Sequence, residues 1–144
     1  MSKMRLSLIA LLLSLGVSQL FSQRVVAYHQ WFNSAKVQGW YWDNVTDVNI
    51  CFLQVDASGG VGFAPNNGTD LNNYEQGLFE SFLATAKTKG KRLFISIGGA
   101  SETQAINFRT ISQSQSLSNT FAQNMVDFCN DYGLDGMVYD VKQL

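Results

Sequence analysis

The chain has 144 residues, of which 46% are hydrophobic and 15% are charged, and its formal net charge is −1. This composition is typical of a globular protein and argues against a disordered or fibrous chain. A charge so close to zero gives no electrostatic basis for a nucleic-acid partner, and a single histidine, His29, argues against a histidine-rich metal site. We expect no metal and no other cofactor.

The first 22 residues have the three-part layout of a secretory signal peptide. Lys3 and Arg5 precede an apolar run at residues 6–17, and small polar residues such as Ser22 follow it. A membrane anchor is the alternative, but the apolar run is about a dozen residues long, short of the roughly 20 that span a bilayer. We therefore expect cleavage near residue 22, secretion to the periplasm or extracellular space, and no stable membrane anchor afterwards.

Residues 23–144 alternate between strand and helix patterns. Short apolar runs rich in β-branched residues predict strands at residues 24–29, 47–55, 92–97 and 134–141. Near-continuous apolar strands separated by helices favour an α/β fold with a parallel sheet covered on both faces.

Two segments have a helical spacing of apolar residues, at residues 74–90 and 117–133. Ser118 is the predicted N-cap of the second helix and Gly133 its end. The segment at residues 56–70, rich in glycine and asparagine, predicts a loop. The predicted core-facing positions of the two helices are Leu78, Phe79, Phe82, Leu83, Ala86, Phe121, Met125, Phe128, Cys129 and Tyr132.

The chain has two cysteines, Cys51 in a predicted strand and Cys129 in a predicted helix. Export would make a disulfide chemically possible. We favour two buried free thiols, because cysteine commonly packs as a small apolar residue.

The residues that follow the predicted strands carry the functional argument, since parallel α/β folds bind ligands at the carboxyl ends of their strands. Gly98 and Gly99 follow the third strand directly, where they permit close approach of backbone or ligand. Taken alone, they fit either a nucleotide-binding loop or a structural turn, and the full G-x-G-x-x-G spacing is absent. In the fourth strand, alternation places Val138, Asp140 and Lys142 on one face and Tyr139 on the other.

Taken in chain order, these features resemble glycoside hydrolase family 18, the chitinases and their relatives. The resemblance rests on a first strand ending in Tyr28, an N-x-x-F pattern formed by Asn49 and Phe52, the Ser96-Ile97-Gly98-Gly99 segment, and the Asp135-Gly136 pair. It extends over residues 23–144 and implies a partial (β/α)8 TIM barrel of about the first four βα units.

The family's fourth-strand signature is D-x-x-D-x-D-x-E, which residues 135–142 match at two of its four acids. Asp135 and Asp140 occupy the first and third acid positions, Val138 the second, and Lys142 that of the glutamate. By resemblance, Asp140 orients the substrate's 2-acetamido group, whose oxygen is the nucleophile of a retaining, substrate-assisted reaction, and Asp135 is a buried supporting acid.

The resemblance also implies a substrate-binding surface for a polysaccharide that contains N-acetylglucosamine, such as chitin. Tyr28 and Ser96 lie where the family builds the floor of its site, and Gly98 and Gly99 are also expected to bind substrate. Trp31 follows the first strand closely enough to stack on a sugar, although a tryptophan there also fits ordinary packing.

The residue at position 142 argues against catalysis. The family's glutamate is its general acid, and a lysine could donate a proton only if its pKa fell by several units. Beside Asp140 it is expected to form an ion pair, and loss of a general acid costs about 10²–10⁴ in rate. We expect no useful hydrolysis by this chain, and whether to class it as an enzyme stays open at this point.

Length leads to a related expectation, because a TIM barrel takes roughly 200 residues or more. We expect a fragment that corresponds to the N-terminal part of the barrel, with a small open four-stranded sheet as the alternative. Two other functions remain possible from the sequence. One is a non-enzymatic carbohydrate-binding protein that uses Trp31, Trp40 and Trp42, and the other is a small exported α/β protein without affinity for such sugars.

Overall fold

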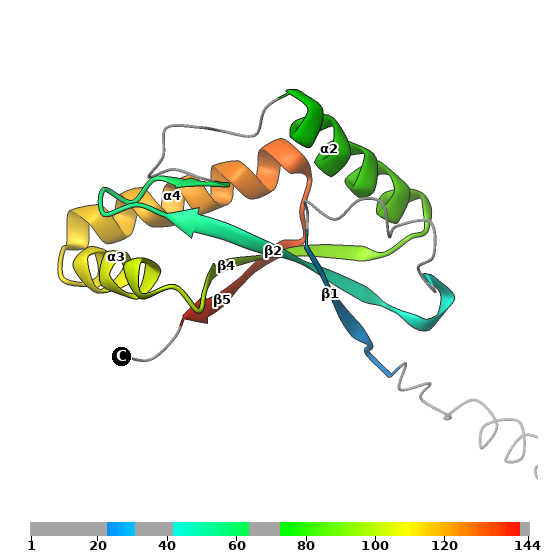
Figure 1. Cartoon of the computed structure of the whole chain (residues 1–144), viewed down its shortest axis with the longest axis horizontal. Coiled ribbons are helices and arrows are strands. Elements are labelled where there is room, and N and C mark those ends of the chain that lie inside the picture. The colour runs from blue at the N-terminus through cyan, green and yellow to red at the C-terminus, as the bar shows by residue number, and fades with distance from the viewer. Residues whose placement is uncertain (1–22, 31–41, 64–72, 142–144) are drawn as a thin grey trace, which may run out of the picture.

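The computed structural model describes residues 23–30, 42–63 and 73–141 of the chain. The predicted signal peptide, Trp31, Trp40 and Lys142 lie outside the described residues. The elements are β1 Val26–Gln30, the short 3₁₀ helix η2 Trp42–Asn44, β2 Asp47–Val55, β3 Val61–Gly62, α2 Asn73–Thr88, β4 Arg92–Gly99, α3 Glu102–Ser112, α4 Gln115–Tyr132 and β5 Gly136–Val141 (Figure 1).

Four parallel strands form the sheet in the order β1-β2-β4-β5, and the short β3 pairs antiparallel with β2. Because the order in space follows the order in sequence, the sheet is wound in one direction, as in a barrel. The described helices accordingly lie over one face, as α2 and α4 do in Figure 1. The expectation of a sheet covered on both faces is therefore wrong for the described residues, since coverage of both faces needs a reversal of winding.

The core lies between the strands and this helical layer. Phe79 and Phe82 of α2 are 0% and 1% exposed, and burial of each phenyl ring contributes about 1.5–3 kcal/mol. Leu83 and Ala86 on the same helix face are also buried, which confirms the predicted stripe. Phe121 of α4 is buried in the same core, and the partly buried residues packed against this core include Met125, Phe128 and Tyr132.

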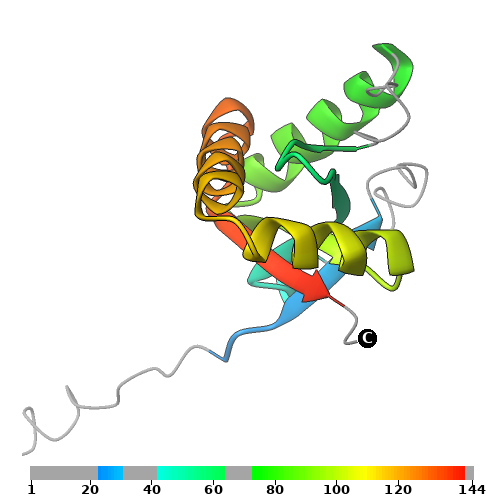
Figure 2. The same cartoon turned by 90° about the vertical axis from the view of Figure 1, so that its left-hand side faces the viewer.

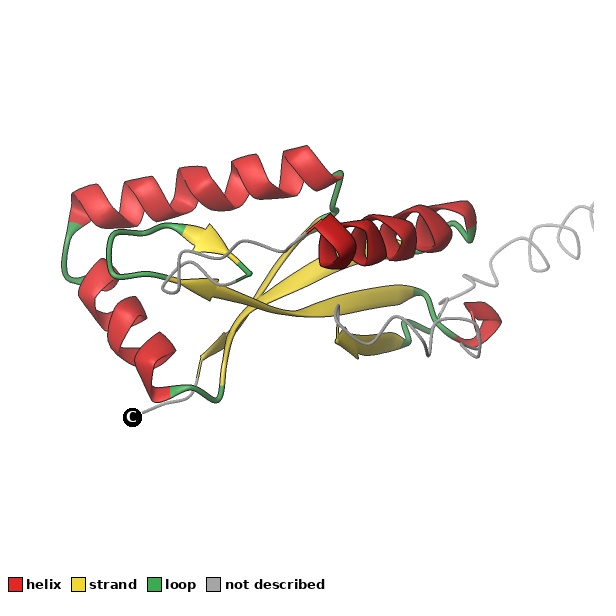
Figure 3. Ribbon diagram, turned by 45° about the horizontal axis from the view of Figure 1, so that its top comes forward, coloured by secondary structure: helices red, strands yellow, loops and turns green. Residues whose placement is uncertain are grey.

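The boundary between α3 and α4 differs from the prediction. Residues 102–112 form the separate helix α3, and the chain turns a tight corner into α4, as Figures 2 and 3 show. Ser114 caps α4 by accepting a hydrogen bond from the Leu117 amide, so the assignment of Ser118 as N-cap is wrong. Ser118 instead donates its hydroxyl to the Ile111 carbonyl inside the corner. Gly133 does end α4, in the left-handed conformation expected of a helix terminus.

Helix α3 holds the carboxyl end of β2 through two buried amides. Gln104 accepts a hydrogen bond from the Val55 amide at 2.7 Å and donates to the Val55 carbonyl at 3.2 Å. Asn107 donates to the same carbonyl at 2.7 Å. The last backbone groups of β2 are thereby satisfied by side chains, where the strand leaves the parallel sheet.

Both cysteines are free thiols, as expected. Cys51 is buried and donates its thiol to the His29 carbonyl at 3.4 Å, whereas Cys129 is only half-buried. Burial raises the pKa of each thiol, which keeps both protonated near neutral pH.

Candidate active site at the carboxyl ends of the strands

The sheet face opposite the helices brings together most of the residues singled out in the sequence. Strand register places Tyr28 beside Asn49, Asn49 beside Phe94, Ser96 beside Val138, and Gly98 beside Asp140. Side chains alternate along a strand, and paired residues of parallel strands share a face. We call this the inner face, because it would point into the interior of a barrel.

The predicted alternation in β5 is confirmed. Val138 lines a hollow of about 340 Å³ on the inner face. Tyr139 points the other way, where its hydroxyl lies 3.3 Å from the Met125 sulfur and its ring meets Phe108 edge-on. The other residues that line the hollow are Arg24, Val26, Asp47, Asn49 and Phe94.

Asp140 lies at the carboxyl end of β5, exposed to solvent and level with Gly98. The backbone of Gly98 has φ +111°, and a Cβ there would lie 2.4 Å from the Asp140 carbonyl oxygen. Burial chiefly raises the pKa of Cys51, and the negative charge of Asp140 adds to the rise, so that carboxylate lies within electrostatic reach of the thiol. The geometry presents an unburied carboxylate at the mouth of the inner face.

Below this carboxylate the inner face is closed by a buried polar pair. The Ser96 hydroxyl donates to the Asn49 side-chain oxygen at 2.9 Å, and both residues are at most 1% exposed. Ser96 therefore lies in the floor of the inner face and is buried from solvent. Gly99 takes φ +85°, and a Cβ at this residue would be in ordinary van der Waals contact with the Phe52 ring. Gly98 and Gly99 therefore form a turn that lies close to Asp140 and Phe52.

Tyr28 is the exposed aromatic residue of the predicted binding surface. It lies on β1, level with Asn49, and is 57% exposed. A ring so placed is free to lie against the apolar face of a sugar. The positions of Trp31 and Lys142 relative to it fall outside the described residues.

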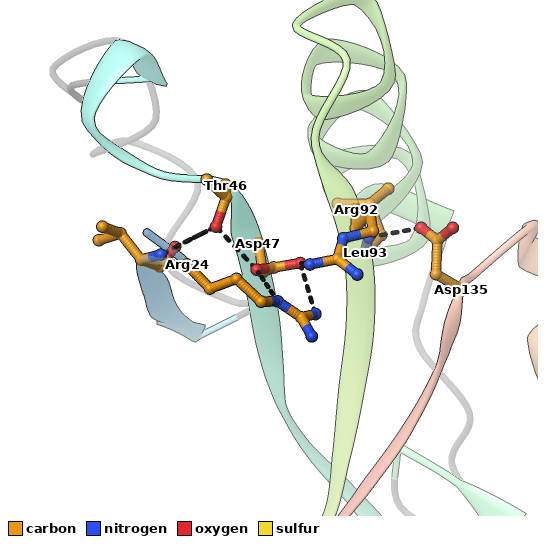
Figure 4. Close-up of polar contacts among 7 residues, drawn as sticks. Arg24, Thr46, Asp47, Arg92, Leu93 and Asp135 are labelled. Atoms are coloured by element: carbon orange, nitrogen blue, oxygen red, sulfur yellow. Dashed lines mark hydrogen bonds and ion pairs between the residues drawn. The ribbon is translucent and has the colours of Figure 1, made fainter. Parts of the chain in front are cut away.

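The structure contradicts the prediction of Asp135 as a buried supporting acid. Asp135 is exposed and precedes β5, at the opposite end of the strand from Asp140. Asp140 lies five positions further along the chain than Asp135, which corresponds to roughly 16 Å of strand. Asp135 Oδ2 accepts a hydrogen bond from the Leu93 amide at 2.7 Å, and the Asp135 amide donates to the Leu93 carbonyl at 2.7 Å (Figure 4). The side chain thus joins β5 to β4 where the chain enters the sheet from α4.

The same end of the sheet carries an ion cluster that sequence reasoning missed. Figure 4 shows Asp47 contacted by Arg24 from before β1 and by Arg92 from the start of β4. Thr46 also donates its hydroxyl to Asp47 Oδ2 at 2.8 Å. Burial acts to raise the pKa of Asp47, but hydrogen bonds from Arg24 and Thr46 and the charges of both arginines outweigh it and lower that pKa. One signal in the sequence could have indicated this cluster. Three of the predicted strands begin with a charged residue, Arg24, Asp47 or Arg92, and parallel strands begin at the same end of a sheet.

The described residues contain neither a metal-binding cluster nor a membrane-spanning helix. No group of three histidine, cysteine or acidic side chains in that part of the chain could hold a metal ion. None of the helices described there is long and apolar enough to cross a membrane.

Comparison with known proteins identifies the fold and the family. The sequence profile described as "Glycosyl hydrolases family 18" matches residues 24–142, whereas no curated protein sequence matches significantly. Among solved structures, a chitinase from Bacteroides thetaiotaomicron has 21% identity and a TM-score of 0.67, covering 84% of this chain and 36% of its own.

Two further structures give the same picture. The chitinase ChiB from the chitin utilization locus of Flavobacterium johnsoniae has 22% identity and a TM-score of 0.67, with 83% of this chain and 36% of that one covered. The spore cortex-lytic enzyme SleL of Bacillus cereus has 12% identity and a TM-score of 0.62, with 84% and 28% covered.

The chain thus spans about a third of the length of the structures it matches, and its barrel is partial and not closed. The profile match covers most of the sequence, and the strand order and inner face agree with it. The chain belongs to glycosyl hydrolase family 18.

Proposed function

We propose that this chain is a secreted, chitinase-like domain that binds saccharides containing N-acetylglucosamine and does not hydrolyse them. The observation that carries the proposal is the placement of Asp140, exposed at the carboxyl end of β5, where Gly98 allows the two strands to approach closely. A carboxylate at that position can accept a hydrogen bond from the N–H of a 2-acetamido group.

The remaining inner-face residues suit a sugar. Tyr28 offers an exposed ring for stacking, and the covered Ser96–Asn49 pair gives the floor a fixed shape. The relatives named above include chitinases and a spore cortex-lytic enzyme, which supports a polymer of N-acetylglucosamine type as the ligand. The signal-like residues 1–22 support an extracytoplasmic location, where such polymers occur.

The proposed lack of hydrolysis follows from the absence of the general-acid glutamate, whose position in the family signature is occupied by Lys142. In the substrate-assisted mechanism the acetamido oxygen attacks the anomeric carbon while a carboxylic acid protonates the departing oxygen. Lys142 stands two residues after Asp140, at the position of that acid. An ammonium group near the developing positive charge of the sugar opposes the reaction, and a lysine with an ordinary pKa, near 10.4, is a poor general acid at neutral pH.

The proposal is tested by calorimetric titration with the tetramer of N-acetylglucosamine and with the tetramer of glucose, which lacks acetamido groups. We expect heat of binding with the first sugar only. Asp140→Ala should weaken binding about ten- to 150-fold, the effect of losing one hydrogen bond to a charged group, which contributes about 1.5–3 kcal/mol. Asp127→Ala, on the exposed side of α4, is the matched control and should bind normally. Equal binding of both sugars would contradict the role of Asp140.

Chromatography of the same sugar after prolonged incubation tests the second half of the proposal. The intact tetramer should be recovered. Appearance of dimer or monomer would show hydrolysis and refute a non-hydrolytic function. A chain that binds neither tetramer would instead support the alternative hypothesis of a small exported α/β protein without affinity for such sugars.

A further inference from the structure

The positive charges of the chain are distributed unevenly, which its formal net charge of −1 conceals. The described residues contain lysines and arginines at positions 24, 87, 89, 91, 92 and 109. Arg24 precedes β1, and the next four belong to the segment Lys87-Thr88-Lys89-Gly90-Lys91-Arg92, which joins the end of α2 to the start of β4 (Figure 1). Only Arg109 of α3 lies away from the amino ends of the strands. We call residues 87–92 the basic turn.

The basic turn has described neighbours on both sides. Strand β4 lies between β2 and β5, so the turn does not lie at an outer strand of the sheet. The Lys89 amide donates to the Thr85 and Ala86 carbonyls at 3.2 and 3.1 Å, and the Lys91 amide donates to the Ala86 carbonyl at 3.2 Å. Gly90 supplies the left-handed conformation that the turn needs, with φ +64°. The backbone that carries the lysines is therefore fixed to the end of α2.

The lysines of the basic turn have no carboxylate partner within the described ranges. The ion pairs found there join Asp47 to two arginines, so the charges of those arginines face a buried acid. Lys87 donates to the Tyr132 carbonyl at 2.8 Å, at the end of α4. Lys89 is exposed and Lys91 is half-buried. The charges of these lysines are thus available to a ligand.

We propose that the basic turn binds an anionic polysaccharide, a polymer that carries carboxylate or sulfate groups. The lysine ammonium is a compact point charge on a flexible stem, which suits anions spaced along a mobile polymer. The turn has no apolar or aromatic side chain to insert into a lipid surface or to stack on a base, which argues against a membrane and against single-stranded nucleic acid. The choice of a polysaccharide rests on the proposed extracytoplasmic location, whereas the charge distribution does not.

The basic turn and the candidate sugar site lie at opposite ends of the sheet. Arg92 begins β4, whereas Gly98 and the Asp140 level with it lie at the carboxyl end, roughly 20 Å further along the strand. A polymer bound at the turn therefore leaves the mouth of the inner face open. The turn would hold the domain on an anionic matrix while the site binds a neutral sugar.

The test is the affinity of the purified chain for dextran sulfate and for polygalacturonate, with uncharged dextran as the reference. We expect binding to the two charged polymers only, and weaker binding as salt is added, because exposed charges are screened. Lys89→Gln should lower the affinity about threefold, the effect of one exposed ion pair. Arg109→Gln is the matched control, since it removes an exposed charge from α3, and it should leave the affinity unchanged.

The double variant Lys89→Gln/Lys91→Gln adds a readout that a structural role would not change. The slope of log affinity against log salt should become shallower by about one to two, because fewer counterions are released. The same variant should bind the tetramer of N-acetylglucosamine normally, and this tetramer should not displace dextran sulfate. These two results separate a failure of this inference from a failure of the candidate sugar site.

Several results would overturn the inference. They are no binding of either charged polymer, equal binding of uncharged dextran, and equal effects of Lys89→Gln and Arg109→Gln. Tighter binding to phosphatidylserine vesicles or to duplex DNA than to both charged polysaccharides would also overturn it, by assigning the turn to another class of partner. The first two results need no variant, so the inference stays testable if a substitution impairs folding.

Discussion

Gly98 and Asp140 approach so closely that a Cβ on Gly98 would lie 2.4 Å from the Asp140 carbonyl oxygen. The contact joins the end of β4 to the end of β5 and fixes the position of Asp140 along the strand relative to Gly98. The backbone of Gly98 also takes φ +111°, which side chains of L-residues rarely adopt. Both facts require glycine at this position for the site to form.

Gly98→Ala should therefore lower the free energy of unfolding by about 2–3 kcal/mol, through strain and steric overlap together. Urea denaturation followed by circular dichroism measures the change. Gly77→Ala is the control, because Gly77 lies in α2 with open space around its Cβ position, and this substitution should raise stability by about 0.5–1 kcal/mol. A neutral Gly98→Ala would contradict the close approach.

Asp47→Asn should destabilise the sheet through the ion cluster. The substitution removes the charge that faces Arg24 and Arg92 at the amino ends of β1 and β4. We expect a loss of about 2 kcal/mol, below the 3–5 kcal/mol of fully buried pairs, because both arginines reach solvent. The exposed Asp131→Asn should change stability by less than about 0.5 kcal/mol in the same denaturation experiment. Equal effects of the two substitutions would rule out the cluster as a stabilising element.

Stability should fall with decreasing pH because of His29. Burial beside Phe82, on which the imidazole stacks at 4.1 Å, lowers the pKa of His29 to about 4. The unfolded chain binds this proton near its ordinary pKa of about 6.5, so the unfolded state gains protons first. The contribution of the neutral ring is complete above pH 6.5 and is lost between pH 6.5 and 4, to a total of about 3 kcal/mol.

Denaturation midpoints at several pH values check this prediction. His29→Phe should remove most of the slope between pH 6.5 and about 5, since His29 is the only histidine of the chain. The pKa of Asp47 and of Asp56 is lowered, so their contributions are lost only as the pH falls below their ordinary range near 4. A slope that persists in His29→Phe would show that another group is responsible.

Gln104→Met should weaken the carboxyl end of β2. The substitution keeps the approximate volume of the side chain but removes both hydrogen bonds to Val55, leaving its buried amide without its acceptor. We expect a cost of about 1–3 kcal/mol and faster hydrogen exchange at the Val55 amide. Gln123→Met on the exposed side of α4 serves as the reference and should leave that exchange rate unchanged.

The elements that the sequence predicted well are those with a simple apolar period. The strand at residues 47–55 has the predicted bounds, and the buried face of α2 is the predicted one. Helix α3 was missed because its buried face includes the polar residues Gln104 and Asn107. Their burial follows from hydrogen bonds to Val55, and a tertiary contact of this kind leaves no periodic signal in the sequence.

The candidate site was predictable to a similar extent. Alternation along β5 correctly separated Val138 from Tyr139, because that period is a property of every strand. It could not show that Asp135 precedes the strand and faces solvent, since this depends on where α4 ends and how the chain enters the sheet. The ion cluster was missed because its three charged members are far apart in sequence and meet only through strand register.

The most direct test of the account is a nuclear magnetic resonance titration of the isotope-labelled chain with the tetramer of N-acetylglucosamine. We predict that the amides of Tyr28, Gly98 and Asp140 shift progressively, that those of Leu93 and Asp135 stay in place, and that the tetramer of glucose has no such effect. Shifts centred on Asp135, or equal shifts with both sugars, would contradict a site for acetamido sugars at the carboxyl ends of the strands.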